Sequence, residues 1–168
     1  HNVNLKVIRT QAAGYFFDDE LIEADIHTDD QEWRMWKKKT DPVLHIDLRN
    51  WADIMVVAPL DANTLAKIAN GLCDNLLTCV LRAWDLRKPV LVCPAMNTNM
   101  WTHPFTATHL GVLQDTLTFK IISPISKTLA CGDTGIGAMA EPQTIVAQTM
   151  ALLEEQEKPA HLLEKDLL

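Results

Sequence analysis

Two continuous apolar runs limit the folds that this chain can adopt more than any other feature. DIMVVAPL, residues 53–60, and KPVLVCPA, residues 88–95, lack the polar and apolar alternation of a strand with one wet face. Such runs are typical of parallel strands buried on both faces. The first is followed by ANTLAKIANG, residues 62–71, whose helical spacing ends at Gly71. A buried strand followed by a helix predicts an α/β sheet.

The rest of the chain continues this alternation. Further strands are expected at residues 3–10 and 117–124, and an irregular acidic stretch is expected through Asp30. The expected helices are marked by caps, prolines or amphipathic spacing, and they cover residues 41–52 with Asp41 as N-cap, 74–84 with a cap at Asp74, 104–114 from Pro104, and 141–155. We therefore predict an open, mostly parallel Rossmann-like (flavodoxin-like) sheet with helices on both faces. Residues 1–155 would form one domain and residues 156–168 a charged tail.

Composition argues against several classes of function. With 168 residues, 48% of them hydrophobic, the chain suits one domain with a single core. The net charge of -7 argues against sequence-independent binding to nucleic acid, and we interpret Lys37–Lys39 as a solvated loop. No apolar run reaches the ~18 residues of a membrane span and no signal peptide is recognised, so we expect a soluble, cytoplasmic protein. Cys73, Cys79, Cys93 and Cys131 lack metal-ligand spacing, which predicts reduced thiols and no metal site.

A ligand is expected at the carboxyl ends of the strands, where open α/β sheets bind their ligands. Three segments reach that edge, namely RTQAA (9–13), PLDANT (59–64) and PAMNTNMW (94–101). Asn63 and Thr64 either cap a helix or place polar groups against an anion. Asn97 is harder to explain as a turn residue, because its amide offers two donors and an acceptor in one plane.

Three other features leave two interpretations each. His45 is either a core or capping histidine or a functional one. Cys131 is either a small buried hydrophobe or an exposed thiol. The glycine-rich loop ISKTLACGDTGIGAMAE, residues 125–141, forms either a hinged flap or a tight turn. These patterns predict a ligand-binding α/β domain but no particular reaction.

Four long motifs occur in order along the chain: DPVLHIDLR, ADIMVVAPLDANTLAKIANGLCDNLLTCVLRAW, PAMNTNMW and LACGDTGIGAMAE. With QEWRMW, which replaces a DEWRMW-like segment, they resemble the flavin-dependent cysteine decarboxylases from about residue 3 to residue 152. The resemblance implies an FMN protein that forms a homotrimer, or a heterotrimer with sibling chains, with the flavin between subunits. The motifs are most similar to those of the eukaryotic coenzyme A branch, which implies decarboxylation of 4'-phosphopantothenoylcysteine to 4'-phosphopantetheine.

The resemblance also implies roles for individual residues. By motif position, His45 would be the active-site base and carboxylate-facing group, Asn97 would hold the substrate carboxylate, and Cys131 would donate a proton. Ala130 and Met139 would lie along the substrate flap. The flavin would be lined by Ala62, Asn63, Thr64, Leu65 and Ala95, with Gln11, Ala12 and Ala13 beneath it.

The chain departs from the family pattern at two points. It starts at what should be the second strand, so the family's first strand and the Gly-Ser turn that cradles the FMN phosphate are expected to be missing from residues 1–168. TQAA carries alanines where many relatives place serines near the cofactor. Two alternatives therefore remain: a non-catalytic regulatory subunit of a protein phosphatase, and a decarboxylase of a peptidyl C-terminal cysteine. The joint presence of His45, Asn97 and Cys131 favours an enzyme over the regulatory subunit.

Overall fold

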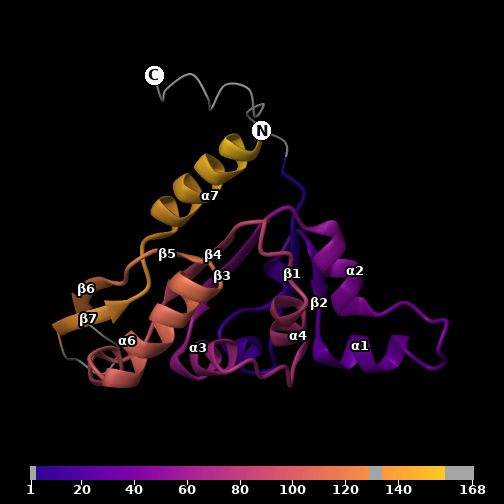
Figure 1. Ribbon diagram of the computed structural model, residues 1–168, viewed down its shortest axis with the longest axis horizontal. Helices are drawn as coiled ribbons and strands as arrows, with labels where there is room; N and C mark the ends of the chain where they lie inside the picture. Colours follow the sequence, from indigo (N-terminus) through magenta and orange to yellow (C-terminus); the bar gives the residue numbers. More distant parts are fainter. Residues whose placement is uncertain (1–2, 129–133, 158–168) are drawn as a thin grey trace. The chain divides into compact units, whose positions relative to one another are not determined.

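The computed structural model describes residues 3–128 and 134–157 (Figure 1). They divide into two compact units. The first unit takes the chain up to Ala52 together with Lys67–Asp85. The second unit takes Asp53–Ala66 and the chain from Leu86 onward.

The first unit combines a small parallel sheet with three helices. Strand β1 (Lys6–Ile8) pairs in parallel with β2 (Asp25–His27), and the connection carries two short 3-10 turns, η1 (Ala12–Tyr15) and η2 (Asp19–Leu21). The helices are α1 (Asp29–Met35), α2 (Leu44–Trp51) and α4 (Leu76–Arg82). They bury an apolar core that consists of Leu44, Leu48, Leu76, Leu77, Val80, Leu81 and Trp84, with Ile68. This core holds α2, and therefore His45, in place.

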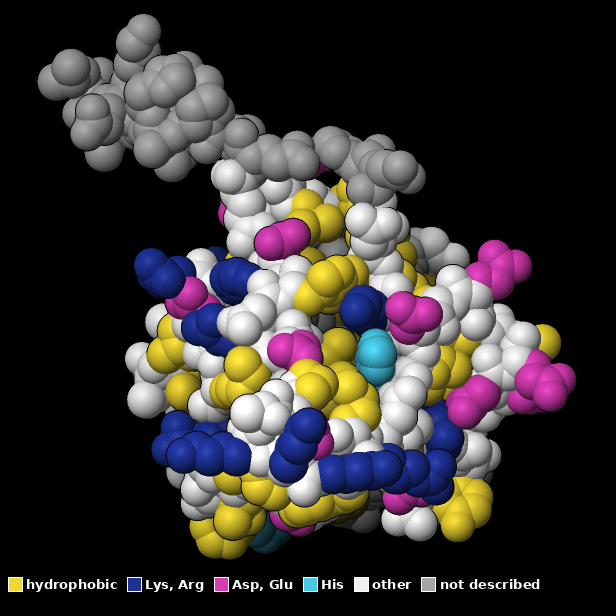
Figure 2. All heavy atoms as spheres, turned by 90° about the vertical axis from the view of Figure 1, so that its right-hand side faces the viewer, with side chains coloured by type: hydrophobic (Ala, Val, Ile, Leu, Met, Phe, Trp, Pro, Cys, Tyr) yellow, Lys and Arg dark blue, Asp and Glu magenta, His cyan; other side chains and the backbone are white. Residues whose placement is uncertain are grey.

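Several large apolar side chains of the first unit remain at the surface. Tyr15 is 86% exposed, Phe16 88%, Leu21 79% and Trp33 78%. Figure 2 shows one face of the molecule, on which hydrophobic side chains (yellow) lie at the surface between charged ones. Exposed apolar area of this kind is common where a protein binds a partner.

The prediction of an irregular stretch through Asp30 was wrong. That stretch contains β2, whose residues pair with β1 from Lys6↔Asp25 to Ile8↔His27, and it ends in the start of α1. The strand has only three residues, so its pattern is too short to recognise without its pairing partner. The start of α1 is marked by Gln31, whose side-chain oxygen accepts a hydrogen bond from the Thr28 N–H at 3.4 Å.

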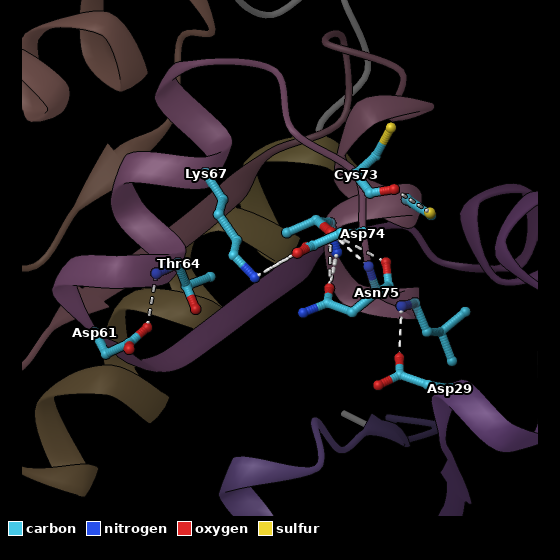
Figure 3. A network of polar contacts seen from close by, with 10 residues as sticks. Asp29, Asp61, Thr64, Lys67, Cys73, Asp74 and Asn75 are labelled. Atoms are coloured by element: carbon cyan, nitrogen blue, oxygen red, sulfur yellow. Dashed lines mark hydrogen bonds and ion pairs between the residues drawn. The ribbon is translucent and has the colours of Figure 1, made fainter.

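Two predicted helix caps were assigned to the wrong residue. Helix α2 begins at Leu44, and Asp41 instead closes the preceding turn by accepting from the N–H groups of Lys37 (2.8 Å) and Lys38 (2.9 Å). The cap of α4 is Asn75, whose Oδ1 accepts from the Thr78 N–H at 2.8 Å (Figure 3).

The neighbouring Asp74 has a different partner. Its carboxylate accepts from the Lys67 ammonium at 2.8 and 3.0 Å. Asp74 and Asn75 both belong to the residue types that cap helices, so local sequence does not separate them, and the nearby lysine accounts for the choice.

The second unit contains a three-stranded parallel sheet in the order β3-β4-β5. Its strands are β3 (Met55–Leu60), β4 (Val90–Pro94) and β5 (Lys120–Ile121). The two predicted apolar runs are β3 and β4, and every residue of β4 is buried. The predicted open α/β class with parallel strands is confirmed.

Helices follow the strands of the second unit in the predicted order. Helix α3 (Ala62–Ala69) comes directly after β3 and continues into the first unit, and the short helix α5 (Thr98–Trp101) comes after β4. Helix α6 (Pro104–Gly111) runs into a π-helical turn, η3 (Val112–Thr116), and the chain closes with α7 (Pro142–Glu157). The starts at Pro104 and near residue 141 agree with the sequence analysis.

The glycine-rich segment 125–141 contains an antiparallel pair, β6 (Ile125–Thr128) and β7 (Thr134–Ala138). Residues 129–133, which include Ala130 and Cys131, lie outside the described part of the chain. Among the residues that the structure describes, every helix is too short or too polar to cross a lipid bilayer.

Candidate functional site

The candidate base His45 of the first unit lies against a carboxylate. It is the second residue of α2, and its Nδ1 contacts Glu32 Oε1 from α1. Both side chains are partly buried, with 27% of His45 and 17% of Glu32 exposed. The interpretation of His45 as a capping histidine is not supported, because its imidazole contacts this side chain instead of a backbone N–H.

A thiol lies beside this pair. Ligand atoms of Glu32, His45 and Cys79 are all within 4.8 Å of one another. Cys79 Sγ donates to the carbonyl of Cys73 at 3.4 Å. Burial, followed by the Glu32 carboxylate and Cys73, raises the pKa of Cys79 to about 11, so the thiol is neutral near pH 7.

The same three residues have the ligand types of a zinc site. Zinc needs a thiolate, and its ligand atoms lie ~2.0–2.3 Å from one point. Here the thiol keeps its proton and Glu32 already occupies His45 Nδ1. The arrangement is therefore a His45–Glu32 hydrogen bond with a neutral thiol, Cys79, beside it.

Helix α2 is also held at its other end. The Arg49 Nε donates to the Ala83 carbonyl at 2.9 Å, and the same guanidinium lies 3.7 Å from the Asp85 carboxylate. The helix that carries His45 is thus tied to α1 near its start and to the end of α4 near its last turn. Such anchoring restricts the position of the imidazole.

The segment predicted to lie beneath a flavin forms the first 3-10 turn of this unit. Gln11 and Ala12 are exposed and Ala13 is half-buried. The Ala13 N–H donates to Thr10 Oγ1 at 3.2 Å. This turn follows β1, and β1 and β2 are parallel, so the turn starts at the same sheet edge as His27, the last residue of β2.

In the second unit, Asp61 caps α3. Its Oδ1 accepts from the Thr64 N–H at 2.9 Å (Figure 3). Its carbonyl accepts from the Leu65 N–H at 2.9 Å. Asp61 therefore takes the capping role that one of the two interpretations gave to Asn63 and Thr64. Asn63 is exposed, Ala62 and Thr64 are half-buried, and the Leu65 side chain belongs to the core.

Backbone hydrogen bonds join the segment that follows β4 to the last residue of β3 and to β7. The Ala95 N–H donates to the Leu60 carbonyl, and the Met96 N–H donates to the Gly137 carbonyl, both at 2.9 Å. Asn97 follows directly and caps α5, with its Oδ1 accepting from the Asn99 N–H at 2.9 Å. The cap fixes the plane of the Asn97 amide.

Glycines permit this close approach. Gly137 has a φ of +146°, a conformation that side chains rarely adopt. A Cβ at Gly137 would lie 2.1 Å from the Met96 carbonyl oxygen, and one at Gly135 would lie 2.4 Å from Thr98 Oγ1. Strand β7 therefore contacts the backbone around Asn97 at a distance that only glycine allows.

The remaining predicted residues are placed as follows. Met139 is partly buried and packs against the core cluster of Leu91, Cys93, Ile122, Ala140 and Ile145. Ala130 and Cys131 lie outside the described residues. The second unit thus brings Ala62–Leu65, Ala95 and Asn97 to one edge of its sheet, while His45 and Gln11–Ala13 belong to the first unit.

Comparison with known proteins gives this arrangement a family. Residues 1–154 match the model of the family described as Flavoprotein. The phosphopantothenoylcysteine decarboxylase of Mus musculus is 54% identical over 153 residues, which are 91% of this chain and 74% of the mouse protein. The chain belongs to the Flavoprotein family.

Solved structures agree with this assignment. A cysteine-to-serine variant of PPC decarboxylase, complexed with pantothenoylaminoethenethiol, matches with a TM-score of 0.86 and 53% identity, over 89% of this chain and 82% of that one. The FMN-binding protein AtHal3 matches with a TM-score of 0.83 and 53% identity, over 91% of this chain and 83% of that one. The predicted resemblance to flavin-dependent cysteine decarboxylases is confirmed.

The residues of this Flavoprotein-family chain fit a flavin. Thr98 Oγ1 in the second unit is buried and has no hydrogen-bond partner among the described residues. Both ring nitrogens of His27 in the first unit are likewise buried without a partner there. Buried polar atoms normally have partners, and these lie where segments leave the carboxyl ends of strands, the usual ligand edge. Ala62 and Ala95 are half-buried and carry small side chains. Within the second unit, the orphaned Thr98 hydroxyl and the small side chains of Ala62 and Ala95 suit a planar cofactor with polar edges.

Sequence reasoning missed two residues in each unit, Glu32 and His27 in the first and Asp61 and Thr98 in the second. Asp61 directly precedes a helical segment, so its type and position could have identified it as the cap. Glu32 lies 13 residues before His45 on another helix, and no sequence spacing connects them. His27 and Thr98 become notable only because the fold buries them.

Proposed function

We propose that this chain is a carboxy-lyase that converts 4'-phosphopantothenoylcysteine to 4'-phosphopantetheine in coenzyme A biosynthesis, with FMN as cofactor. The observation that carries the proposal is the 54% identity to the mouse protein named for this activity. The pantothenoylaminoethenethiol held by a 53% identical relative supports the substrate class, because it contains a pantothenoyl group joined to an ethenethiol without a carboxylate.

The cofactor would be held mainly by backbone and small side chains. Ala62, Asn63, Thr64, Leu65 and Ala95 would line it, with Gln11, Ala12 and Ala13 beneath it. FMN supplies a two-electron oxidant that takes electrons from the thiol-bearing carbon and later returns them, which no side chain can do. Loss of carbon dioxide from a cysteine needs such a temporary electron sink.

In this proposal His45 removes the substrate's thiol proton. A neutral imidazole can accept a proton near neutral pH, and α2 is anchored at both ends, which keeps the imidazole in one place. General bases of this kind contribute ~10²–10⁴-fold to a rate. His45 would also face the substrate carboxylate.

Asn97 would hold the substrate carboxylate by donating from its amide. The Asn97 cap offers a clean test of this role, because aspartate caps helices as well as asparagine does. Asn97→Asp should preserve α5 and FMN binding but place a like charge against the carboxylate. We expect substrate affinity to fall at least ~100-fold, measured by titration. Asn99→Asp adds the same charge at an exposed position two residues away and should bind substrate nearly as well as the parent.

Cys131 would be the acid that protonates the decarboxylated product, with Ala130 and Met139 along the substrate flap. An unperturbed thiol is mostly protonated at pH 7, so it can serve as a donor. The proposal places this step after the loss of carbon dioxide. Substitution of Cys131 should therefore leave the first half of the reaction intact.

One single-turnover experiment tests the reaction as a whole. The parent, when mixed with substrate without oxygen, should release carbon dioxide and form 4'-phosphopantetheine. Cys131→Ser should release carbon dioxide but accumulate the oxidised enethiol, whereas His45→Asn should release none. The exposed Cys73 provides the control, since Cys73→Ser should match the parent. Formation of 4'-phosphopantetheine by Cys131→Ser at the parental rate would exclude Cys131 as the acid.

Assembly and location complete the proposal. We propose a homotrimer, or a heterotrimer with sibling chains, in the cytoplasm. The exposed Tyr15, Phe16 and Trp33 provide apolar area that a neighbouring subunit could cover. Light scattering of the purified flavin-bound protein should give three times the mass of the chain, and a stable flavin-bound monomer would contradict the trimer.

A further inference from the structure

The contact between Glu32 and His45 is a feature of the candidate site that the proposed roles do not use. The Glu32 carboxylate comes from α1 and meets Nδ1 of a histidine on α2. Most of each side chain is removed from water, so the contact is not a loose surface pair. A carboxylate can only accept a hydrogen bond, so a neutral imidazole in this contact carries its proton on Nδ1.

We propose that Glu32 is a positioning residue that holds His45 in the Nδ1–H tautomer and leaves Nε2 as the nitrogen that accepts the substrate's proton. The proposal rests on the proposed function, in which His45 is the base. Which nitrogen of a histidine is free to react is set by the hydrogen bond that the other nitrogen makes. Glu32 makes that bond here and does not itself need to touch the substrate.

The other groups around the pair do not compete for this role. The Cys79 thiol donates a hydrogen bond to the Cys73 carbonyl at 3.4 Å. Asp29, also from α1, accepts from the Leu76 N–H at 2.7 Å. Burial and the charge of Glu32 keep Cys79 neutral by raising its pKa to about 11. Glu32 is therefore the carboxylate in direct contact with the imidazole.

Glu32→Gln is the informative change because glutamine has the same shape. Its amide can donate to Nδ1 and thereby favour the opposite tautomer, with the proton on Nε2. In that tautomer Nε2 cannot accept the substrate's proton. We expect kcat to fall ~100-fold with little change in KM, in line with the contribution of a general base.

The test has a readout that does not depend on activity. Proteins labelled with ¹⁵N-histidine are compared by NMR, with the His45 signals assigned by their loss in His45→Asn. In the parent, Nδ1 should carry the proton and Nε2 should not. In Glu32→Gln the proton should shift toward Nε2. The control is Asp30→Asn on the same helix, whose carboxylate forms an exposed pair with Arg34, and it should change neither the tautomer nor kcat.

Each outcome decides the proposal. A parent His45 with its proton on Nε2 would overturn it without any variant, as would a Glu32→Gln protein that keeps both the parental tautomer and the parental kcat. A tautomer change without loss of kcat would limit Glu32 to a structural role and also overturn it. Full activity in His45→Asn would instead overturn the base in the proposed function, while the NMR result for Glu32 would still stand on its own.

Discussion

The two units position their candidate residues in different ways. In the first unit His45 is placed by side chains, with Glu32 at its ring and Arg49 anchoring its helix to Ala83 and Asp85. In the second unit the candidate flavin edge is placed by backbone, with hydrogen bonds from Ala95 and Met96 and caps at Asp61 and Asn97. The first arrangement depends on charge and the second on chain conformation. Substitutions that test charge and those that test conformation should therefore act on different units.

The largest effect on stability is expected at Gly137. Alanine there would be strained at a φ of +146° and would press a Cβ against the Met96 carbonyl. Gly137→Ala should lower the free energy of unfolding by more than ~2 kcal/mol, measured by urea denaturation. Gly111 is the matched control, since its φ is -57° and its nearest neighbour would be an Asp115 oxygen at 3.8 Å. Gly111→Ala should raise stability by ~0.4–1 kcal/mol. Equal effects at the two glycines would refute the argument.

A smaller loss is expected at the cap of α4 in the first unit. Asn75→Ala removes the acceptor of the Thr78 N–H and should cost ~1 kcal/mol of unfolding free energy. Asn75→Asp keeps an oxygen at the same position and should lie close to the parent. If urea denaturation ranks aspartate no better than alanine, the cap is not the source of the stability.

The pKa values of two thiols, one in each unit, are raised by different causes. The pKa of Cys79 in the first unit is raised to about 11 by burial and then by Glu32, whereas burial alone raises the pKa of Cys93 to about 11. Glu32→Gln should lower the pH at which Cys79 is alkylated and leave Cys93 unchanged. Mass spectrometry after pulses of iodoacetamide follows both residues. A parallel shift at Cys93 would show that the variant had loosened the whole protein.

The raised pKa values of these two thiols determine how the stability of the protein changes at alkaline pH. Their folded pKa values lie above the unfolded value of ~8.5, so the unfolded chain loses these protons first as the pH rises. The two protonated thiols contribute fully to the free energy of unfolding below pH ~8.5, and this contribution is lost as the pH rises toward about 11. Urea denaturation between these limits should show falling stability, and Cys93→Ala should flatten the fall.

The smallest effect is expected at the exposed pair of Lys67 and Asp74. The hydrogen bond from Lys67 is the main cause that lowers the pKa of Asp74. Lys67→Met should move the titration of this carboxyl toward its ordinary range, as followed by NMR. The pair stabilises the fold above the unfolded pKa of ~3.9 and loses this effect as the pH falls through the folded value. Because the carboxyl is exposed, urea denaturation at pH 7 should hardly distinguish the variant from the parent.

The sequence was sufficient to predict those strands and helices that carry a long apolar run or a clear start signal. Strands β3 and β4 were recognisable because whole runs of residues are apolar, and α6 because Pro104 marks its start. Strand β2 could not be recognised, because three residues carry no period and their place depends on pairing with β1. The acidic residues Asp41 and Asp74 were of the correct type for caps. Asp41 instead accepts hydrogen bonds from N–H groups of the preceding turn, and Asp74 accepts from a lysine side chain.

The candidate site shows the same limit. Family motifs indicated His45, Asn97 and Cys131, and the family itself is confirmed, while the roles of these residues remain predictions. Glu32 and Thr98 lie within the motifs QEWRMW and PAMNTNMW, but no local pattern indicated their contacts or those of His27, because these come from packing between distant segments. The sequence could indicate candidate residues for the chemistry, but not which neighbours hold or surround them.

The complete burial of β4 has a consequence for local opening. The strand pairs with β3 on one side and, at Leu91 and Val92, with β5 on the other, and the Ala95 amide that follows donates to the Leu60 carbonyl of β3. Amides of such a central strand exchange with solvent deuterium only when most of the unit unfolds. The Ala95 side of the flavin edge should thus be among the slowest-exchanging parts of the second unit. Any breathing that admits a substrate must come from a segment outside this ladder.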